Sequence, residues 1–298
     1  MTGLSLLAFL GAGYTHLSRD TYDGVCFGTV VKKGLQWMMA HQGTDGCIGD
    51  PKGPYVLFNH ALMAAALSEA YGLTSSSVFK QNAQKSIDYL LSTQNAGGGW
   101  GQSPGSGDND PFVTAWCVMA LVSARASGLA VPDVDFDRAR ARLNAVAAEI
   151  DSGKARGFVL PGIDKTATEG DVLTAVVMMS RTFTEKDRSD PWFNRSAKRL
   201  LGRLPDWDPA GIDFNRWYFA SLALFRYDGP QGFFWKGWNE RLKQALVMNE
   251  KRQDDGCANG SWDPIGPWGG QGGRVWATAI NTLTMEVYYR YASAFGLR

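Results

Sequence analysis

Asp110-Pro-Phe-Val-Thr-Ala-Trp-Cys-Val-Met-Ala-Leu121 is the most informative stretch of the chain. Asp110 is typical of a helix N-cap, because its carboxylate can accept hydrogen bonds from the first-turn N–H groups, and Pro111 suits the first helical position. From Phe112 to Leu121 nearly every side chain is apolar. A surface helix has a single apolar stripe, so this pattern predicts a helix that is buried on several sides.

The same pattern returns along the whole chain. The buried helix follows a Gly-rich turn, Gly97 to Gly101, and an amphipathic helix that ends at Gln94. Apolar helices are predicted at Thr2–Gly13, Phe58–Tyr71, Asp110–Ser127, Asp171–Thr184, Asp213–Tyr227 and Arg274–Ser293. Amphipathic helices are predicted at Tyr22–Gln42, Ser77–Gln94, Asp135–Ile150, Asp190–Leu204 and Trp235–Gln253, so the last apolar helix has no partner after it.

The apolar helices can be aligned on one anchor residue each. Thr2, His60, Thr114 and Trp217 are followed by a small and then a large apolar residue, while Thr174 and Thr278 fit more loosely. The anchors recur about every 43 to 61 residues, which is typical of helical repeats. We therefore expect an all-α fold, a single domain over residues 1–298. It would be an (α/α)6-type toroid with an inner ring of apolar helices, an outer ring of amphipathic helices and the last outer helix missing.

Composition excludes several classes of function. Lys and Arg number 30 against 29 Asp and Glu, so the net charge of +1 gives no global field that would attract nucleic acid. No apolar run is long enough to span a membrane. The four cysteines match no zinc spacing and only three histidines are present, so we expect no metal and no cofactor. Met1 lies directly on the first predicted helix, which is compatible with a domain cut from a longer protein. A signal or anchor would then lie upstream of Met1, and the compartment stays open.

Gln94-Asn-Ala-Gly-Gly-Gly-Trp100 resembles the QW turn of squalene–hopene cyclases, and Gln42…Asp45-Gly46 and Gln253…Asp255-Gly256 are similar but degraded. Thr114 to Leu121 resembles the inner-helix motif of the prenyltransferase and squalene-cyclase repeats. Nearly the whole chain takes part in this resemblance, which implies a terpenoid cyclase-like α/α toroid. His60-Ala61, Asp213…Trp217-Tyr218 and Trp262-Asp-Pro are most similar to uncharacterised bacterial members of planctomycete type. No activity is implied by that similarity.

The catalytic motifs of these relatives are absent from the sequence. Class II cyclases protonate an alkene with a D-x-D-D motif, whereas the nearest string here, Asp133-Val-Asp-Phe-Asp137, has another spacing and suits a solvated N-cap cluster. Zinc-dependent prenyltransferase subunits need a downstream His, and none follows His60. Complement-like thioester domains need Glu-Gln soon after a Cys, and neither Cys47 nor Cys257 has it. Fold similarity alone therefore does not supply a function.

Polar residues remain at the N-terminal ends of the apolar helices. Asp110, Asp171 and Asp213 precede their anchors, and Arg274 has the same place on the last helix. In a ring these groups would meet at one mouth of a central cavity, where ligands usually bind. The three aspartates and His60 are therefore the catalytic candidates. Alternatively the acids are helix caps with Arg274 neutralising one of them, and His60 is a buried structural histidine.

Aromatic and basic residues give the ligand-binding candidates: Trp116, Arg216, Trp217, Tyr218, Arg274 and Trp276. The aromatic rings could line an apolar cavity or stabilise a carbocation, and core packing explains them equally well. Arg216 and Arg274 are the only plausible basic pair for an acidic sugar.

Three functions stay open. The first, slightly favoured, is a non-catalytic toroid that binds an apolar, isoprenoid-like ligand or a protein partner. The second is a cyclase-type enzyme with a non-standard Asp as its acid, and the third is a carbohydrate-active lyase or hydrolase.

Overall fold

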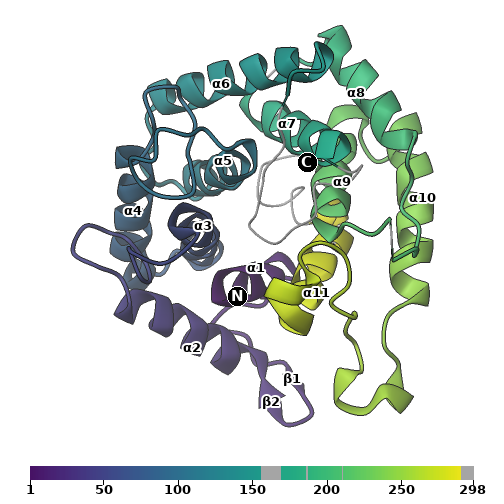
Figure 1. The fold of residues 1–298 in the computed structure, drawn as a ribbon. Helices are drawn as coiled ribbons and strands as arrows, with labels where there is room; N and C mark the ends of the chain where they lie inside the picture. The colour runs from purple at the N-terminus through teal and green to yellow at the C-terminus, as the bar shows by residue number, and fades with distance from the viewer. Residues whose placement is uncertain (156–168, 186, 210, 290–298) are drawn as a thin grey trace. The chain divides into compact units, whose positions relative to one another are not determined.

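The computed structural model describes residues 1–155, 169–185, 187–209 and 211–289. These residues are mostly helical, so the predicted all-α class is confirmed for this part of the chain (Figure 1). The elements are α1 (Thr2–Gly11), β1 (Thr21–Tyr22), β2 (Val25–Cys26), α2 (Phe27–Ala40), α3 (Val56–Thr74), α4 (Ser77–Ser92), α5 (Pro111–Ala126), α6 (Asp133–Asp151), α7 (Glu169–Thr184), α8 (Pro191–Leu201), α9 (Phe214–Asp228), α10 (Phe233–Met248), the 3-10 helix η1 (Gln253–Ala258) and α11 (Gly269–Met285).

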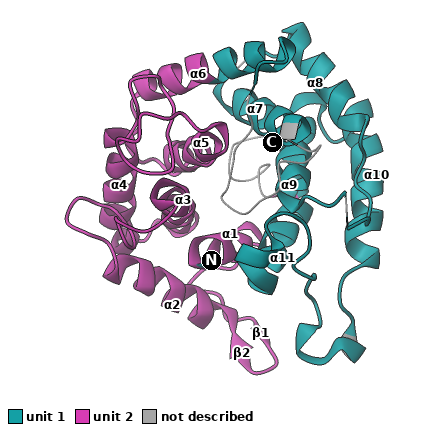
Figure 2. Cartoon of the chain, viewed as in Figure 1, with its two compact units in different colours: residues 1, 143–288 teal, residues 2–142, 289–298 magenta. Residues whose placement is uncertain are grey.

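The chain divides into two compact units, and the boundary falls inside a helix. Residues 2–142 form most of one, here called the N-terminal unit, and residues 143–288 form most of the C-terminal unit. Figure 2 colours them magenta and teal, and the colour changes part-way along α6. The two units are therefore joined by a continuous helix.

In the N-terminal unit the apolar helices form one layer and the amphipathic helices lie against it. α3 packs against α1 on one side and α5 on the other, while α2 packs on α1, and α4 packs on α3 and α5. α5 buries residues all round, from Phe112 to Leu121. α4 buries one face, made of Phe79, Ala83, Ile87 and Leu90 among others. The predicted pairing of a buried helix with an amphipathic one is confirmed in this unit.

The C-terminal unit repeats this arrangement. α9 packs against α7 and α11, α8 packs on α7 and α9, and α10 packs on α9 and α8. Every residue of α9 from Phe214 to Phe225 is buried, including Asn215 and Arg216. α9 is therefore the central helix of this unit and carries polar groups into its interior.

Two turns of the N-terminal unit are built alike around a glutamine. The Nε2 atom of Gln42 donates to the carbonyls of Gly46 (3.1 Å) and Asn82 (3.0 Å). The Nε2 atom of Gln94 donates to the carbonyls of Gly98 (2.8 Å) and Asp135 (3.0 Å). Each glutamine thus closes its own turn and also holds the next amphipathic helix along the chain. The turn at Gln42 keeps this geometry despite its degraded sequence.

Glycine is required where these turns approach the following helix. Gly46 and Gly98 have positive φ values of 94° and 86°. A Cβ atom on Gly46 would lie 2.2 Å from the carbonyl oxygen of Lys85, and one on Gly98 would lie 2.3 Å from that of Arg138. A side chain at either position would push the turn away from the helix.

Three predicted helix boundaries were wrong. The helix expected from Tyr22 begins at Phe27, because residues 21–26 form the antiparallel β1–β2 hairpin around Asp23-Gly24, a dipeptide that favours such turns. The helix expected to end at Gln253 ends at Met248, and η1 follows after Asn249. The last helix begins at Gly269, bends at Gly273 and ends at Met285. Residues 290–293 of its predicted range lie outside the described residues.

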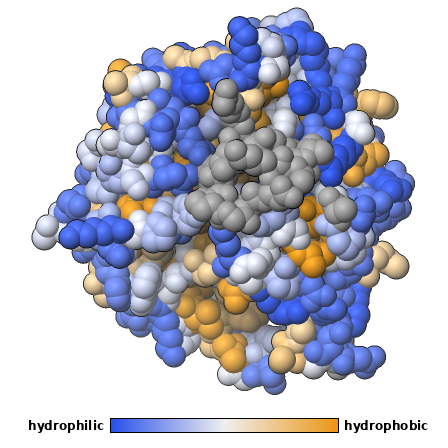
Figure 3. All heavy atoms as spheres, in the orientation of Figure 1, coloured by the Kyte–Doolittle hydropathy of each residue, from blue (hydrophilic) through white to orange (hydrophobic). Residues whose placement is uncertain are grey.

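In Figure 3 hydrophilic residues cover most of the face shown, and hydrophobic residues occur in separate groups. None of the helices among the described residues has the length and hydropathy that crossing a membrane would require. This finding agrees with the absence of a membrane span in the sequence.

Candidate functional site

His60, a predicted catalytic base, is bonded through both ring nitrogens to the main chain. Nδ1 accepts from the N–H of Ile48 (3.1 Å), and Nε2 donates to the carbonyl of Ser86 (2.8 Å). Burial lowers the pKa of His60 to about 4, so the ring is neutral at pH 7. Neither nitrogen is left to exchange a proton with a substrate, and the geometry is that of a structural histidine.

Thr114 has the same role as His60 one repeat later, which supports the predicted alignment of the anchors. The N–H of Trp100 donates to Oγ1 of Thr114 (3.0 Å), just as the N–H of Ile48 donates to His60. The indole Nε1 of Trp100 also donates to the carbonyl of Leu90 (2.8 Å). Both anchors therefore attach the preceding turn to the buried helix.

Asp110 caps α5, as predicted. Oδ1 accepts from the N–H groups of Phe112 (2.8 Å) and Val113 (3.1 Å), and Oδ2 accepts from Nε2 of Gln102 (3.1 Å). Burial raises the pKa of Asp110 to about 6, although the three hydrogen bonds oppose that shift. The carboxyl group is therefore a weaker acid than an ordinary aspartate and still performs a capping role.

Three aromatic rings lie beside one another near this cap. The ring centroid of Phe58 is 5.7 Å from that of Phe112 and 6.3 Å from that of Trp116. Phe112 and Trp116 are buried, and Phe58 is half-buried. Trp116 therefore lies on α5, the helix that Asp110 caps, and its ring packs in an aromatic cluster.

Asp213 and Arg216 occupy the start of α9 in the C-terminal unit. Oδ1 of Asp213 accepts from the N–H of Arg216 (3.1 Å), which confirms the predicted cap. Asp213 is 3% exposed and Arg216 is 1% exposed. Burial raises the pKa of Asp213, although hydrogen bonds and Arg216 oppose the rise. A carboxyl group and a guanidinium group are thus buried in a single helical turn.

The guanidinium of Arg216 is only partly bonded. Nη2 donates to the carbonyl of Arg203, and Cζ lies 5.3 Å from the ring centroid of Trp238. Nε has no acceptor among the described residues. Burial lowers the pKa of Arg216 to about 10, with Asp171 and Asp213 opposing the shift, so the group stays cationic at neutral pH.

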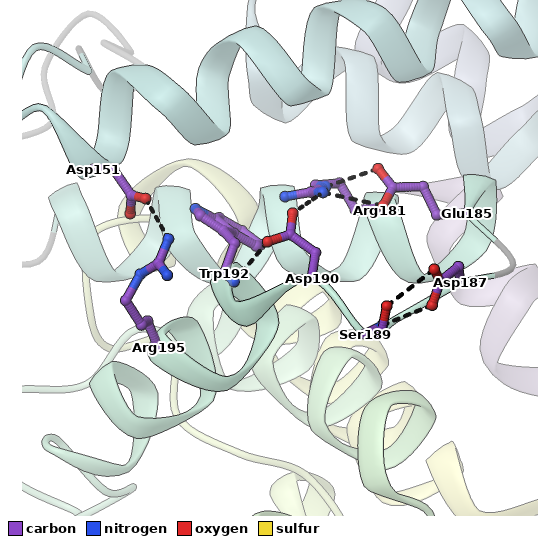
Figure 4. A network of polar contacts seen from close by, with 8 residues as sticks. All are labelled: Asp151, Arg181, Glu185, Asp187, Ser189, Asp190, Trp192 and Arg195. Atoms are coloured by element: carbon purple, nitrogen blue, oxygen red, sulfur yellow. Dashed lines mark hydrogen bonds and ion pairs between the residues drawn. The ribbon is translucent and has the colours of Figure 1, made fainter.

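Arg181, near the C-terminal end of α7, is a second buried arginine, and its guanidinium is paired with two carboxylates (Figure 4). Arg181 donates from Nε and Nη2 to Glu185 (2.8 and 3.1 Å) and from Nη2 to Asp190 (2.8 Å). Burial alone would lower the pKa of Arg181, but these two carboxylates raise it instead. Arg181 therefore joins α7 to the N-terminus of α8 as a structural ion pair, and Arg216 has no such arrangement.

Four aromatic rings lie close to one another at the start of α9. Phe214 lies 5.4 Å from Trp217, 5.8 Å from Trp207 and 5.9 Å from Trp276, measured between ring centroids. Trp207 also lies 6.2 Å from Trp217. Trp207 is half-buried, whereas the other three are buried. We call Trp207, Phe214, Trp217 and Trp276 the aromatic group.

Asp171 and Arg274 differ from their predicted roles. α7 begins at Glu169, so Asp171 lies within its first turn rather than at the N-cap, and its Oδ1 is 3.2 Å from Nε of Arg199. Arg274 does not neutralise a capping acid, because it donates to Asp263 (2.6 Å) and to Oγ of Ser261 (3.0 Å). Loop residues before α11 thus provide the partners of Arg274, which the helical alignment could not reveal.

Tyr218 is the remaining ligand-binding candidate, and the His, Cys, Asp and Glu side chains are the potential metal ligands. Tyr218 is buried in α9, with its ring 5.4 Å from that of Phe219, and belongs to the core. Within the described ranges, no three His, Cys, Asp or Glu side chains gather as metal ligands. Cys47 is buried and Cys257 is exposed, and both are free thiols.

Comparison with known proteins gives a fold and no family. No family model matches the chain, and no curated protein sequence matches it. A structure described as a novel alpha-amylase from Clostridium perfringens is similar over 96% of this chain and 86% of its own, at 12% identity and a TM-score of 0.58. That similarity shows a shared helical fold.

Two structures of Salmonella alpha-2-macroglobulin are also similar in part. One was reacted with methylamine and the other is a mutant; identities are 15% and 14%, and TM-scores are 0.48 and 0.49. They cover 81% and 86% of this chain but only 17% of their own length. The chain therefore spans about a sixth of those proteins.

The C-terminal unit brings several predicted residues together. Asp213, Arg216 and Trp217 share the start of α9, Trp276 joins their aromatic group, and Asp171 acts electrostatically on Arg216. Asp110, His60 and Trp116 belong to the other unit. Sequence reasoning missed Arg203, Trp207 and Phe214, of which the first two lie in the loop between α8 and α9. The string Leu204-Pro-Asp-Trp-Asp208, with a tryptophan between two acids, was the available signal.

Proposed function

We propose that the chain binds a carbohydrate at the start of α9, in the C-terminal unit. The observation that carries the proposal is the combination of buried, incompletely bonded Arg216 with half-exposed Trp207 in the adjoining loop. A sugar offers a flat C–H face that can stack on an indole ring and hydroxyl groups that can accept hydrogen bonds from a guanidinium group. Ligand sites commonly combine an apolar lining with a few placed polar groups.

Hydrogen-bonding capacity favours a polar ligand over an isoprenoid at this site. Besides Nε of Arg216, the side-chain N–H groups of Asn215 and Trp217 have no acceptor among the described residues. A buried donor without an acceptor costs about 1–3 kcal/mol. A hydrocarbon could not accept these hydrogen bonds, whereas sugar oxygens could.

Binding can be tested with soluble polysaccharides. The full chain would be run in native gels containing starch, xylan, cellulose derivatives or pectin, with Trp207→Ala as the site variant. Trp37→Ala is the matched control, because Trp37 is 44% exposed on α2, in the other unit. We expect retardation by at least one polysaccharide that Trp207→Ala loses and Trp37→Ala keeps. Equal mobility of all three proteins on every polysaccharide would refute the proposal.

Cleavage of the bound sugar is an extension of the proposal. Glycosidases use one carboxylic acid and one carboxylate, and Asp213 and Asp171 both act on Arg216. The raised pKa of Asp213 suits the acid role. Asp228 is the control, because its carboxylate accepts from the N–H groups of Phe234 and Trp235 in the first turn of α10. Release of new reducing ends that is abolished in Asp213→Asn, but kept in Asp228→Asn, would support cleavage. Unchanged chain length would leave a binding protein only.

A second candidate function uses Asp110. Its raised pKa and the neighbouring rings of Phe58, Phe112 and Trp116 favour protonation of an apolar alkene. Incubation with squalene or a prenyl diphosphate would test this function. Turnover by the unmodified chain that Asp110→Asn lacks would support it, and absence of product from the unmodified chain would refute it.

For the scaffold we propose that all the hairpins belong to one (α/α)6-type toroid. Support comes from the same packing order in both units, with α3 between α1 and α5 and α9 between α7 and α11. Small-angle X-ray scattering distinguishes a closed ring from an open row of hairpins by the maximum dimension of the particle. A dimension too long for a ring would refute the toroid.

A further inference from the structure

We infer that the ligand at the start of α9 carries carboxylate groups, so that it is an acidic, uronate-type sugar rather than a neutral one. This inference rests on the proposed carbohydrate binding. It identifies Arg216 as the residue that binds the carboxylate, with the aromatic group beside it contacting the sugar ring.

The first support is that both carboxylates acting on Arg216 bond to groups other than its guanidinium. The charged groups that act on it are Asp171, Asp213 and Arg203. Asp171 is also bonded to Arg199 at 3.2 Å. Asp213 is occupied in capping α9 through the N–H of Arg216. Arg216 itself has no ion-paired carboxylate among the described residues, and a buried cation without a paired anion favours a negatively charged ligand.

The second support is the number of unbonded donors in this helical turn. Nε of Arg216, Nδ2 of Asn215 and Nε1 of Trp217 are side-chain donors without an acceptor among the described residues, and all three residues are buried in the first turn of α9. The N-terminus of a helix of 15 residues adds a partial positive charge at the same place. Unbonded N–H donors in one helical turn favour a ligand rich in acceptors, and a carboxylate provides two oxygens with several lone pairs.

The third support is the fixed orientation of the guanidinium. Trp238 lies over its face at 5.3 Å, and Nη2 is held by the carbonyl of Arg203. A planar guanidinium held in this way recognises the planar carboxylate better than a hydroxyl group. The aromatic group, with Trp207 half-exposed, gives the adjoining apolar surface that a phosphate or sulfate ion alone would not use.

The test compares ligands that differ only in charge. Affinity of the full chain would be measured by calorimetry for oligogalacturonate, for its fully methyl-esterified form and for inorganic phosphate. We expect the acid to bind at least about tenfold more tightly than the ester. The advantage should fall as salt is raised, since charge attraction is screened. Tighter binding of phosphate than of oligogalacturonate would overturn the assignment to a sugar carboxylate.

Failure of the inference differs from failure of the proposed function. Equal affinity for acid and ester would overturn the inference and leave carbohydrate binding intact. Binding of no saccharide, neutral or acidic, would refute both.

Variants locate the interaction. Arg216→Gln should abolish the preference for the acid, while Arg195→Gln should keep it, because Arg195 is 57% exposed and bonded to Asp151 elsewhere in the unit. If Arg216→Gln does not fold, the preference for the acid is measured in Arg216→Lys, together with the salt dependence of the unmodified chain. An unchanged preference in a folded Arg216 variant would overturn the role of this residue.

Discussion

At the scale of single residues, His60 couples stability to pH in one direction. Its pKa in the folded chain is about 4, below the usual 6.5. Between these values the unfolded chain binds a proton that the folded chain does not, so the free energy of unfolding rises with pH. The main physical reason is that burial disfavours the charged ring, and a protonated ring would also present a second N–H to the Ile48 amide, which already donates to Nδ1.

Asp110 couples stability to pH in the opposite direction. Its pKa in the folded chain is about 6, above the usual 3.8. Between these values the folded chain holds a proton that the unfolded chain has lost, so the free energy of unfolding falls as pH rises. The two contributions oppose each other over most of the same range.

We predict that Asp110→Asn uncovers the contribution of His60. Asparagine caps a helix about as well as aspartate but does not titrate. The stability of Asp110→Asn should therefore rise by about 3 kcal/mol between pH 4 and 6.5, whereas the unmodified chain should change much less. Urea unfolding across this pH range measures both. A flat profile for Asp110→Asn would contradict the neutral, doubly bonded state of His60.

A second prediction concerns His60 directly. His60→Ala leaves the Ile48 N–H and the Ser86 carbonyl without their side-chain partner and creates a cavity. We expect a loss of about 3 kcal/mol or more at pH 7. Hydrogen exchange should show the Ile48 amide losing protection before the amides of α5. Full protection of that amide in the variant would contradict the prediction.

Residue roles were predictable from the sequence where they depend on near neighbours. The caps at Asp110 and Asp213 depend on N–H groups two or three residues away, so the sequence alone indicated them. The partner of Arg274 is Asp263, in a loop, and the partner of His60 is Ser86, one helix later. Periodicity contains no information on such contacts.

At the scale of elements, glycine in the repeated turn sets how closely a turn can approach the next helix. We predict that Gly98→Ala costs about 2–4 kcal/mol, because φ is 86° and Cβ would meet the carbonyl oxygen of Arg138 at 2.3 Å. Gly105→Ala is the matched control, since its φ is 69° but no atom lies within 4 Å of its Cβ, and should cost about 1 kcal/mol. Chemical denaturation measures the two. Equal losses would show that the close approach contributes nothing.

Helices were easier to predict than their boundaries. α3 and α5 are apolar on all sides, a pattern that survives any error of one or two residues in register. The β1–β2 hairpin was missed because its strands have two residues each, too few for an alternating pattern. Only Asp23-Gly24 indicated the turn, and it lay next to a strong helical pattern.

At the scale of the whole molecule, the two units should respond differently to a ligand. A sugar bound at the start of α9 should protect amides of α7 and α9 from hydrogen exchange and leave α3 and α5 unchanged. At a ligand concentration of about 100 times the dissociation constant, the added stability is about 2.7 kcal/mol. Exchange measured by mass spectrometry resolves these segments. Protection confined to α3 and α5 would place the ligand in the N-terminal unit.

The site itself is the part that sequence reasoning predicted least completely. Asp213, Arg216 and Trp217 were identified because they lie on a recognisable helix, whereas Trp207 and Arg203 lie in a loop without periodicity. Which rings meet depends on the path of that loop, as the 5.8 Å approach of Trp207 to Phe214 illustrates. Composition and spacing do not determine such a path.

The glutamine turns have a consequence for how the chain matures on the ribosome. Gln42 donates to a carbonyl 40 residues later in the chain, and Gln94 donates to one 41 residues later. Each hairpin therefore leaves the exit tunnel with one hydrogen bond of its glutamine not yet formed, and this bond forms when the following hairpin emerges. We expect nascent chains to become protease-resistant in steps that trail synthesis by one repeat.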